Sequence, residues 1–193
     1  MNEELISLFR EHIAAVVPLP EVDAAASRIV AAVGGSSPHL PVTALIAGAY
    51  QCLLPRVPQP EALRLVARAF HEPIRPYVYE GTKAALDASD DPFTVITDMS
   101  KDRERNYFGD DFSFSRTESP AHYHVDVHRC FYVHVLAVAG VPELGTVFCD
   151  FDAAWIDAID PDRHHVAFHR PTTIARGGST CPFHFHRVTP ESP

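Results

Sequence analysis

The chain has 193 residues, an apolar content of 46%, a charged content of 21% and a formal net charge of −9. This length and composition are typical of one globular domain with a buried core. The acidic charge and the lack of a basic run argue against nucleic acid as a partner. The apolar stretches are too short and too interrupted to span a bilayer.

The beginning of the sequence, MNEELISLFREH, is acidic and helical in pattern, unlike a signal peptide, so we expect a cytoplasmic protein. Cysteines stay reduced in that compartment. Each of Cys52, Cys130, Cys149 and Cys181 is therefore a free thiol, a catalytic group or a metal ligand. A small molecule is the expected partner, and antiparallel edge strands could also support a homodimer.

The first 90 residues are predicted to be helical because their apolar residues recur with helical spacing. The expected helices cover residues 3–17, 21–33, 41–54 and 59–89. The second of them should stop at Gly34, a typical residue for a helix end. The third is apolar nearly all round, which predicts a buried helix. Pro73 and Pro76 should break or kink the fourth.

From residue 91 onward the pattern changes to one with several alternating stretches. We expect strands over residues 92–99, 110–118, 123–129, 164–175 (bent at Pro171) and 181–188. A short helix is predicted over 131–140, a longer one over 142–159, and a turn at 176–179. The sequence thus predicts an α+β fold, with a helical N-terminal half packed with an antiparallel sheet from the C-terminal half. We expect a single domain over residues 1–193, helical over 1–90 and sheet-containing over 91–190.

Histidines fall on alternate positions in the stretch HYHVDVHRC, residues 122–130. On a strand His122, His124, Asp126 and His128 share one face, with Tyr123, Val125 and Val127 on the other; His184 and His186 likewise alternate with Phe183 and Phe185. Imidazoles of this kind could bind zinc, nickel, copper or iron. No HExxH-type spacing fixes a ligand set. We therefore favour a polar outer face over a metal site.

The late cysteines lie where elements are expected to begin or end. Cys130 should open a helix, whose N-terminal dipole favours a thiolate, and Arg129 adds a positive charge. Cys149 and Asp152 are three residues apart, which on one helix places them on the same face. Cys181 should open the last strand on its inward side. For each cysteine taken singly, we favour a buried filler over a catalyst, although three thiols at such junctions are less expected of fillers. No CxxC spacing occurs, which argues against a zinc knuckle.

The C-terminal half resembles the L-2-amino-thiazoline-4-carboxylic acid hydrolase family over roughly residues 110–186. The motifs that carry the resemblance are Arg129-Cys130, GVPEL at 140–144, Cys149 with Asp152, and the segment from Arg170 through Gly177-Gly178 to Cys181 and Phe183. Pro182 departs from the family, which often has Asp after this cysteine. The ending GGSTCPFHF also resembles the vinyl-reductase-type ligand-binding domains.

The family resemblance implies hydrolysis of a carbon–nitrogen bond in a cyclic amidine-like substrate; the named reaction opens a thiazoline ring to N-carbamoyl-cysteine. Cys130 or Cys181 would supply the thiolate, with Cys149 a further catalytic candidate. Asp152 would orient the amidine or move a proton. Arg129 or Arg170 would pair with a substrate carboxylate, and Glu143 is a further substrate-binding candidate. The substrate could belong to specialised metabolism.

Two other readings remain open for the same residues. The thiol mechanism needs no cofactor, but Cys130, Cys149 and Cys181 could instead bind zinc or another divalent metal that activates water. Of the two mechanisms we favour thiol catalysis. Outside hydrolysis, the fold could serve as a ligand-binding module like the vinyl-reductase-type domains, or as a metal or haem carrier that uses its histidine-rich faces.

Overall fold

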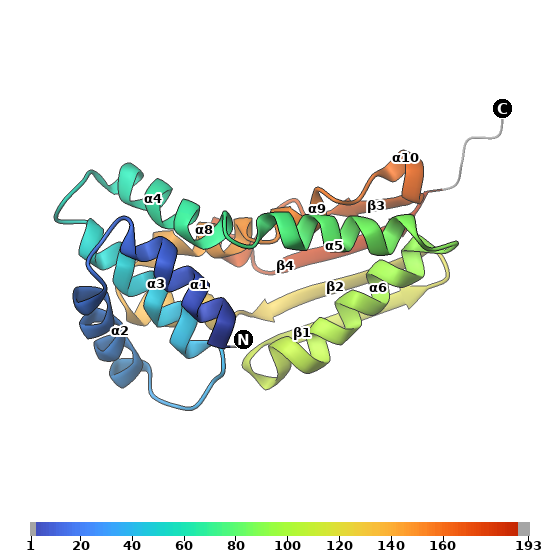
Figure 1. Ribbon diagram of the computed structural model, residues 1–193. Helices are drawn as coiled ribbons and strands as arrows, with labels where there is room; N and C mark the ends of the chain where they lie inside the picture. The colour runs from blue at the N-terminus through green and yellow to red at the C-terminus, as the bar shows by residue number, and fades with distance from the viewer. Residues whose placement is uncertain (1–2, 189–193) are drawn as a thin grey trace. The chain divides into compact units, whose positions relative to one another are not determined.

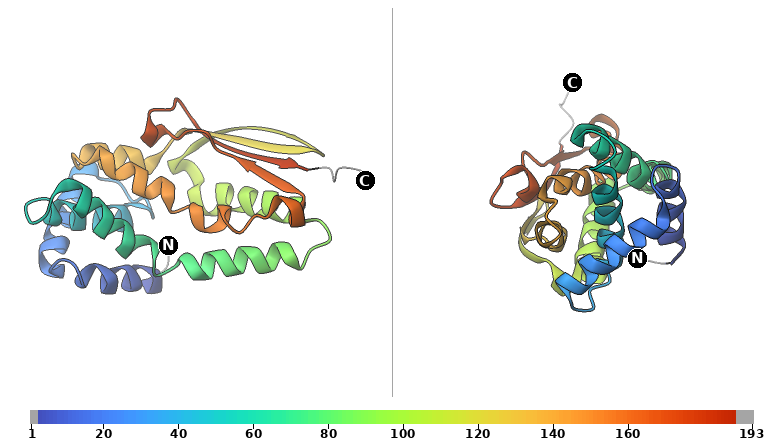
Figure 2. Two further views of the ribbon diagram at one scale, coloured as in Figure 1. Left: turned by 90° about the horizontal axis from the view of Figure 1, so that it is seen from above. Right: turned by 90° about the vertical axis from the view of Figure 1, so that its left-hand side faces the viewer.

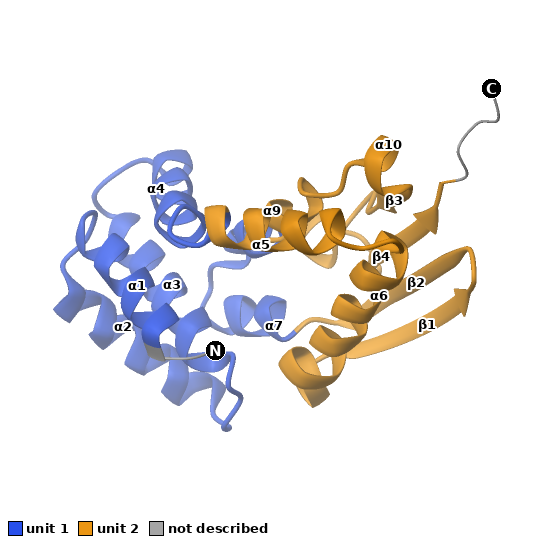
Figure 3. Ribbon diagram, turned by 45° about the vertical axis from the view of Figure 1, so that its right-hand side comes forward, with its two compact units in different colours: residues 1–75, 131–151 blue, residues 76–130, 152–193 orange. Residues whose placement is uncertain are grey.

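The chain forms two compact units, and the computed structural model describes residues 3–188 of it. Unit 1 comprises residues 1–75 and 131–151, and unit 2 comprises residues 76–130 and 152–193 (Figure 3). The chain thus leaves unit 1, returns to it for a short segment, and leaves again. The single domain expected from the sequence stays a prediction.

The described part of unit 1 is helical. Its elements are α1 (Glu3–Ala14), α2 (Leu19–Val33), α3 (Leu40–Leu53), α4 (Gln59–His71), α7 (Phe131–Val138), the 3-10 turn η3 (Pro142–Leu144) and α8 (Gly145–Asp150) (Figure 1). Helix α3 is buried from Val42 to Tyr50, as its apolar sequence predicted. A Cβ at Gly48 would lie 3.0 Å from the backbone nitrogen of Ala26 on α2. The missing side chain therefore lets these two helices pack closely.

The helix ends of the first half follow the glycine and proline signals. Helix α2 ends at Val33, and Gly34 follows with φ +70° and donates its N–H to the carbonyl of Val30 at 2.9 Å. The predicted region 59–89 is interrupted around Pro73, since α4 ends at His71 and the next helix, α5, spans Arg75–Asp87. Pro76 lies in the first turn of α5, where a residue without an N–H is tolerated.

Unit 2 contains a four-stranded antiparallel sheet with the strand order β1-β2-β4-β3. The strands are β1 (Ser113–Ser119), β2 (His122–Arg129), β3 (Val166–His169) and β4 (Cys181–Arg187). The register pairs Val125 with Phe183 and His124 with His184. The predicted strands at 110–118, 123–129 and 181–188 are confirmed, and so is the α+β class.

One face of this sheet packs on helices of the same unit. Tyr123 and Val125 from β2 and Phe185 from β4 join Leu86 of α5 and Trp155 in one buried cluster. Figure 2, seen from above, shows α5 and α6 (Pro92–Asp102) on the same side of the sheet. The opposite face carries the alternating histidines. The predicted assignment of apolar and polar faces on β2 and β4 is confirmed.

Residues 92–99 were predicted to form a strand, and this is wrong, because they lie in helix α6. Asp91 caps the helix by accepting the backbone N–H of Thr94 at 3.2 Å, and Pro92 occupies the first turn. Phe93 and Ile96, three residues apart, are both buried. A spacing of three residues is helical, whereas the short apolar run alone also fits the alternation of a strand. The Asp91 cap is the feature that favours the helix.

Two further elements are shorter than predicted. The helix expected over 142–159 is divided into η3, α8 and α9 (Ala153–Ile156). The strand expected over 164–175 is confined to β3, because the chain turns away from the sheet after His169 and forms a 3-10 turn, η4 (Ile174–Arg176). The short helix at 131–140 is confirmed as α7.

No helix within residues 3–188 has the length and apolar character needed to cross a membrane.

Candidate functional site

Asp152 is the centre of a polar cluster in unit 2. It directly precedes α9, and Trp155 on that helix donates its indole N–H to Asp152 Oδ1 at 3.0 Å. Arg170, which directly follows β3, donates to Oδ2 at 2.8 Å. The Arg170 side chain is only 10% exposed. The structure therefore brings together two predicted site residues, Asp152 and Arg170, as a charge-assisted pair that is largely shielded from solvent.

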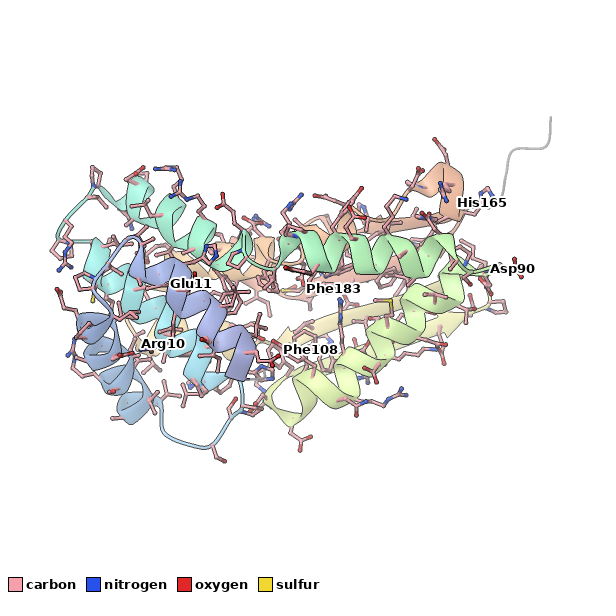
Figure 4. The ribbon with its side chains drawn as sticks, viewed as in Figure 1. Arg10, Glu11, Asp90, Phe108, His165 and Phe183 are labelled. Carbon is pink, nitrogen blue, oxygen red and sulfur yellow. The ribbon has the colours of Figure 1, made fainter. Side chains whose placement is uncertain are left out.

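The same cluster extends to strand β4 through Phe183. The Arg170 guanidinium lies 5.1 Å from the centre of the Phe183 ring, and the Trp155 ring stacks on Phe183 with centroids 6.2 Å apart. Phe183 is labelled in Figure 4. Cys181 lies two residues earlier on the same strand and on the same inward face. Phe183, which contacts the polar cluster, and the Cys181 thiol thus belong to one strand.

The loop before β4 positions the Cys181 thiol. Cys181 is 7% exposed, and the backbone N–H of Ile174 donates to its sulfur at 3.1 Å. Gly177 has φ +86°, a conformation that favours glycine, and a Cβ at Gly178 would lie 2.7 Å from Thr172 Cγ2. The two glycines of the motif therefore allow a tight return of the chain that holds an N–H donor on the sulfur. Such a donor stabilises the thiolate, as hydrogen bonding does for any charged form.

Cys130 lies between β2 and α7, immediately before the first residue of the helix, as predicted. It is half-buried. The neighbouring Arg129 is exposed and donates one guanidinium N–H to the backbone carbonyl of Asp110 at 2.6 Å. This contact ties Arg129 to the loop before β1. Its predicted role toward a substrate carboxylate stays a prediction.

Glu143 and Cys149 belong to unit 1. Glu143 Oε1 accepts the Tyr50 hydroxyl at 2.9 Å and the Gln59 amide at 3.0 Å. Burial raises the pKa of Glu143, but hydrogen bonds from its own backbone N–H, Tyr50 and Gln59 outweigh it and hold the pKa below its usual range. Burial, with the bond to Glu143, raises the pKa of Tyr50 to about 12. Glu143 thereby joins the GVPEL motif to α3 and α4.

The remaining thiols lie in helices of unit 1. Cys149 is half-buried on α8, and since α8 ends at Asp150, the spacing from Cys149 to Asp152 does not lie on one continuous helix. Cys52 lies on α3, where burial and the nearby Glu21 raise its pKa. A raised pKa favours the unreactive thiol form of Cys52.

Arg103 was not predicted as a site residue. It opens a π-helix, η1 (Arg103–Phe108), and its guanidinium lies 5.6 Å from the centre of the Trp155 ring, whose N–H binds Asp152. The next residue, Glu104, points instead to the sheet and accepts the Tyr123 hydroxyl at 2.7 Å. The charged stretch KDRER gives no periodic signal that would separate these two roles. π-helical turns are frequent at functional sites.

The histidine face of the sheet is separate from this cluster. His124 and His184 stack with ring centroids 4.2 Å apart, and His184 Nε2 lies 3.3 Å from Asp126 Oδ1. Burial lowers the pKa of His124, and the neighbouring histidines His184, His186 and His122 lower it further. Burial and the neighbouring histidines also lower the pKa of His186, so the neutral form is favoured at His124 and His186.

Metal ligation by the predicted sets receives no support from the arrangement of side chains. Within residues 3–188, no three His, Cys, Asp or Glu side chains are placed so that they could hold a metal ion. Zinc bound by Cys130, Cys149 and Cys181, and equally a mechanism without a cofactor, stay predictions.

A family model described as L-2-amino-thiazoline-4-carboxylic acid hydrolase matches residues 42–185, which is most of the chain. The chain belongs to this family. No curated protein and no solved structure was found to match it.

Membership in the aminothiazoline carboxylate hydrolase family confirms the resemblance seen in the sequence and extends it toward the N-terminus, to α3. The matched segment contains every predicted site residue, from Arg129 to Cys181. The family name indicates a hydrolase that acts on an aminothiazoline carboxylate. The likeness to vinyl-reductase-type domains stays a prediction.

Proposed function

We propose that the protein is a hydrolase that opens the ring of a cyclic amidine-like substrate carrying a carboxylate, with the Cys181 thiolate as nucleophile. The observation that supports this most is the Asp152 cluster, in which a partly exposed carboxylate is fixed by two donors beside the strand that begins with Cys181. The family match covers all of these residues.

Cys181 is the better candidate for the nucleophile because its sulfur already accepts a backbone N–H. Its strand also carries Phe183, which contacts both Arg170 and Trp155. Cys130 keeps the advantage of its place before helix α7. The two thiols can be distinguished by separate substitutions, since Cys130 lies between β2 and α7 and Cys181 begins β4.

Asp152 is suited to bind an amidinium group. Each carboxylate oxygen accepts one hydrogen bond from the protein and retains a second lone pair, and the side chain is 27% exposed. Arg170 orients this carboxylate through its hydrogen bond to Oδ2. Since Arg170 is already paired, its role is to position Asp152 and not to bind the substrate carboxylate.

Arg103 is proposed as the group that binds the substrate carboxylate. It is half-buried, and it lies over the ring whose N–H binds Asp152. A substrate that binds Asp152 through its amidine would present its carboxylate to the Arg103 guanidinium, which lies over the Trp155 ring. Guanidinium groups pair bidentately with carboxylates.

The reaction consists of two substitutions at one carbon. The thiolate adds to the ring carbon that bears the amino group, and a ring atom leaves with a proton. The enzyme-bound intermediate is an isothiourea if the ring sulfur leaves and an imidodithiocarbonate if the ring nitrogen leaves. Water then attacks the same carbon and releases the thiolate, so that one water is consumed. If the ring nitrogen leaves, the carbon–nitrogen bond is broken and an S-carbamoyl product forms. If the ring sulfur leaves, both carbon–nitrogen bonds survive in an N-carbamoyl product.

The proposal is tested by measuring turnover of 2-amino-thiazoline-4-carboxylate with product analysis by mass spectrometry. Cys181→Ser should lose activity by roughly 10³-fold or more, since removal of a nucleophile is among the most costly changes in an enzyme. Cys52→Ser is the matched control and should keep activity, because its thiol lies on helix α3 of unit 1.

Loss of turnover in Cys130→Ser with normal turnover in Cys181→Ser would show that the nucleophile is Cys130 and not Cys181. A protein that binds the compound and releases no product would contradict hydrolysis and favour the ligand-binding module. A single product, S-carbamoyl or N-carbamoyl, identifies the bond that is broken.

A further inference from the structure

The sheet of unit 2 carries a block of imidazoles on the face that the proposed hydrolysis does not use. His122 and His124 on β2 lie opposite His186 and His184 on β4. His169 on β3 pairs with His184, so the block continues onto a third strand. Cys181 and Phe185 lie on the other face of the same sheet. The block is therefore a feature of its own and does not depend on the proposed function.

The rings within the block are close to one another. His122 and His124 have centroids 4.5 Å apart, and His124 and His186 have centroids 4.5 Å apart at an interplanar angle of 62°. The Nε2 atoms of His124 and His186 are 3.2 Å apart. These two rings thus bring one nitrogen each into contact from adjacent strands.

A separation of 3.2 Å suits two ligands of one metal ion. Nitrogens bound 2.0–2.1 Å from a tetrahedral cation are separated by roughly 3.3 Å. We propose that His124 and His186 chelate one late first-row divalent cation of the zinc type through their Nε2 atoms. Imidazole is a preferred ligand of such cations, whereas magnesium and calcium require oxygen.

The metal-free pair is held by a hydrogen bond, in which one Nε2–H donates to the other Nε2. Moving that ring proton to Nδ1 of the same imidazole, a change of tautomer, frees both Nε2 lone pairs for the cation. No net proton is released by this change. The hydrogen bond therefore holds the two nitrogens at the spacing expected for two ligands of one cation.

The rest of the coordination shell would be water. Both histidines are half-exposed, and no three side chains within residues 3–188 are already arranged around one point. His184 stacks on His124 at 4.2 Å and restricts that ring to its orientation. A two-histidine chelate with open positions binds reversibly, and it connects β2 to β4 across the sheet.

The test is equilibrium dialysis of the untagged full-length protein against Zn²⁺, with Mg²⁺ in parallel, followed by elemental analysis. We expect one Zn²⁺ per chain and no Mg²⁺. His124→Gln and His186→Gln should each weaken Zn²⁺ binding by at least tenfold. His128→Gln is the matched control, because His128 is exposed on the same strand and contacts Ser115 instead of the pair. The far-UV circular dichroism of each variant checks that it is folded.

A second readout uses the unmodified protein. Titration with Zn²⁺ should shift the imidazole NMR signals of His124 and His186 and leave those of His128 in place. Equal Zn²⁺ binding by wild type and His124→Gln would overturn the proposal. Binding that disappears in the Cys130→Ser, Cys181→Ser double variant but persists in His124→Gln would also overturn it, since the zinc would then be on the thiols.

Discussion

At the scale of single residues, Glu104 and Arg103 show how adjacent charges take different roles. Glu104 is 5% exposed and accepts hydrogen bonds from Tyr123, at 2.7 Å, and from Ser100, at 3.2 Å, while Arg116 also binds it. Arg103 stays beside Trp155. The sequence KDRER did not reveal either role, because both depend on the wider turns of the π-helix.

Glu104→Ala should destabilise the protein by roughly 2–3 kcal/mol, because it leaves the buried Tyr123 hydroxyl without its acceptor and removes the partner of Arg116. The measurement is urea unfolding at neutral pH. Glu118→Ala serves as control, since Glu118 is 60% exposed and pairs only at the surface with Lys101; its cost should be below about 1 kcal/mol. Equal effects of the two substitutions would refute the account of Glu104.

Arg103→Gln should lower kcat/KM for the carboxylate-bearing substrate by roughly 10–100-fold, the value of a hydrogen bond between charged groups. The same variant should act normally on 2-aminothiazoline, which lacks the carboxylate. Arg105→Gln, exposed on the same π-helix, is the control. A loss of the same size on both substrates would show that Arg103 acts on the fold or the chemistry and not on the carboxylate.

At the scale of elements, the helices and strands predicted correctly are those in which the apolar periodicity and the residues at the element's ends indicate the same structure. Helix α2 with Gly34 behind it, and strands β2 and β4 with strict alternation, are confirmed. Residues 92–99 were misassigned because a short apolar run fits both periods, and the Asp91-Pro92 start of α6 was the deciding signal. The pairing of Asp152 with Arg170 could not be predicted, since it depends on how β3 and α9 lie together within unit 2.

Two helical glycines give a test of element packing. Gly48→Ala should lower Tm, because its Cβ would lie 3.0 Å from backbone atoms of α2 that cannot move cheaply. Gly81→Ala on α5 should raise stability by about 0.5–1 kcal/mol, since open space surrounds that position and alanine is the better helix former. Thermal unfolding compares them. A stabilising Gly48→Ala would contradict the close approach of α2 and α3.

At the scale of the whole molecule, the chain is divided into two compact units, which composition alone did not indicate. Unit 2 contains the sheet, the Asp152 cluster and the histidine face. Within this unit, Asp87 on α5 binds His164 at 2.9 Å, Arg163 at 2.7 Å and Lys83. These contacts lower the pKa of Asp87 from 3.8 to about 2, with the His164 hydrogen bond first among the causes.

A carboxyl whose pKa is lower in the folded state stabilises the fold fully above its unfolded pKa and ceases to do so as the pH falls. The contribution of Asp87 should therefore be present above about pH 4 and be lost between there and about pH 2. As the pH falls through this window, the Tm of the wild-type protein should decrease more than the Tm of Asp87→Asn. Asp98→Asn, an exposed carboxyl on α6, is the control and should follow wild type. Parallel curves for all three proteins would contradict the role of Asp87.

The central claim, that Cys181 is the nucleophile of a ring-opening hydrolase, is tested most directly by acid-quenching the enzyme during turnover of 2-amino-thiazoline-4-carboxylate and mapping its peptides by mass spectrometry. The account predicts a substrate-derived adduct on the peptide that contains Cys181, and no adduct in Cys181→Ser. An adduct on Cys130, or undiminished turnover by Cys181→Ser, would contradict it.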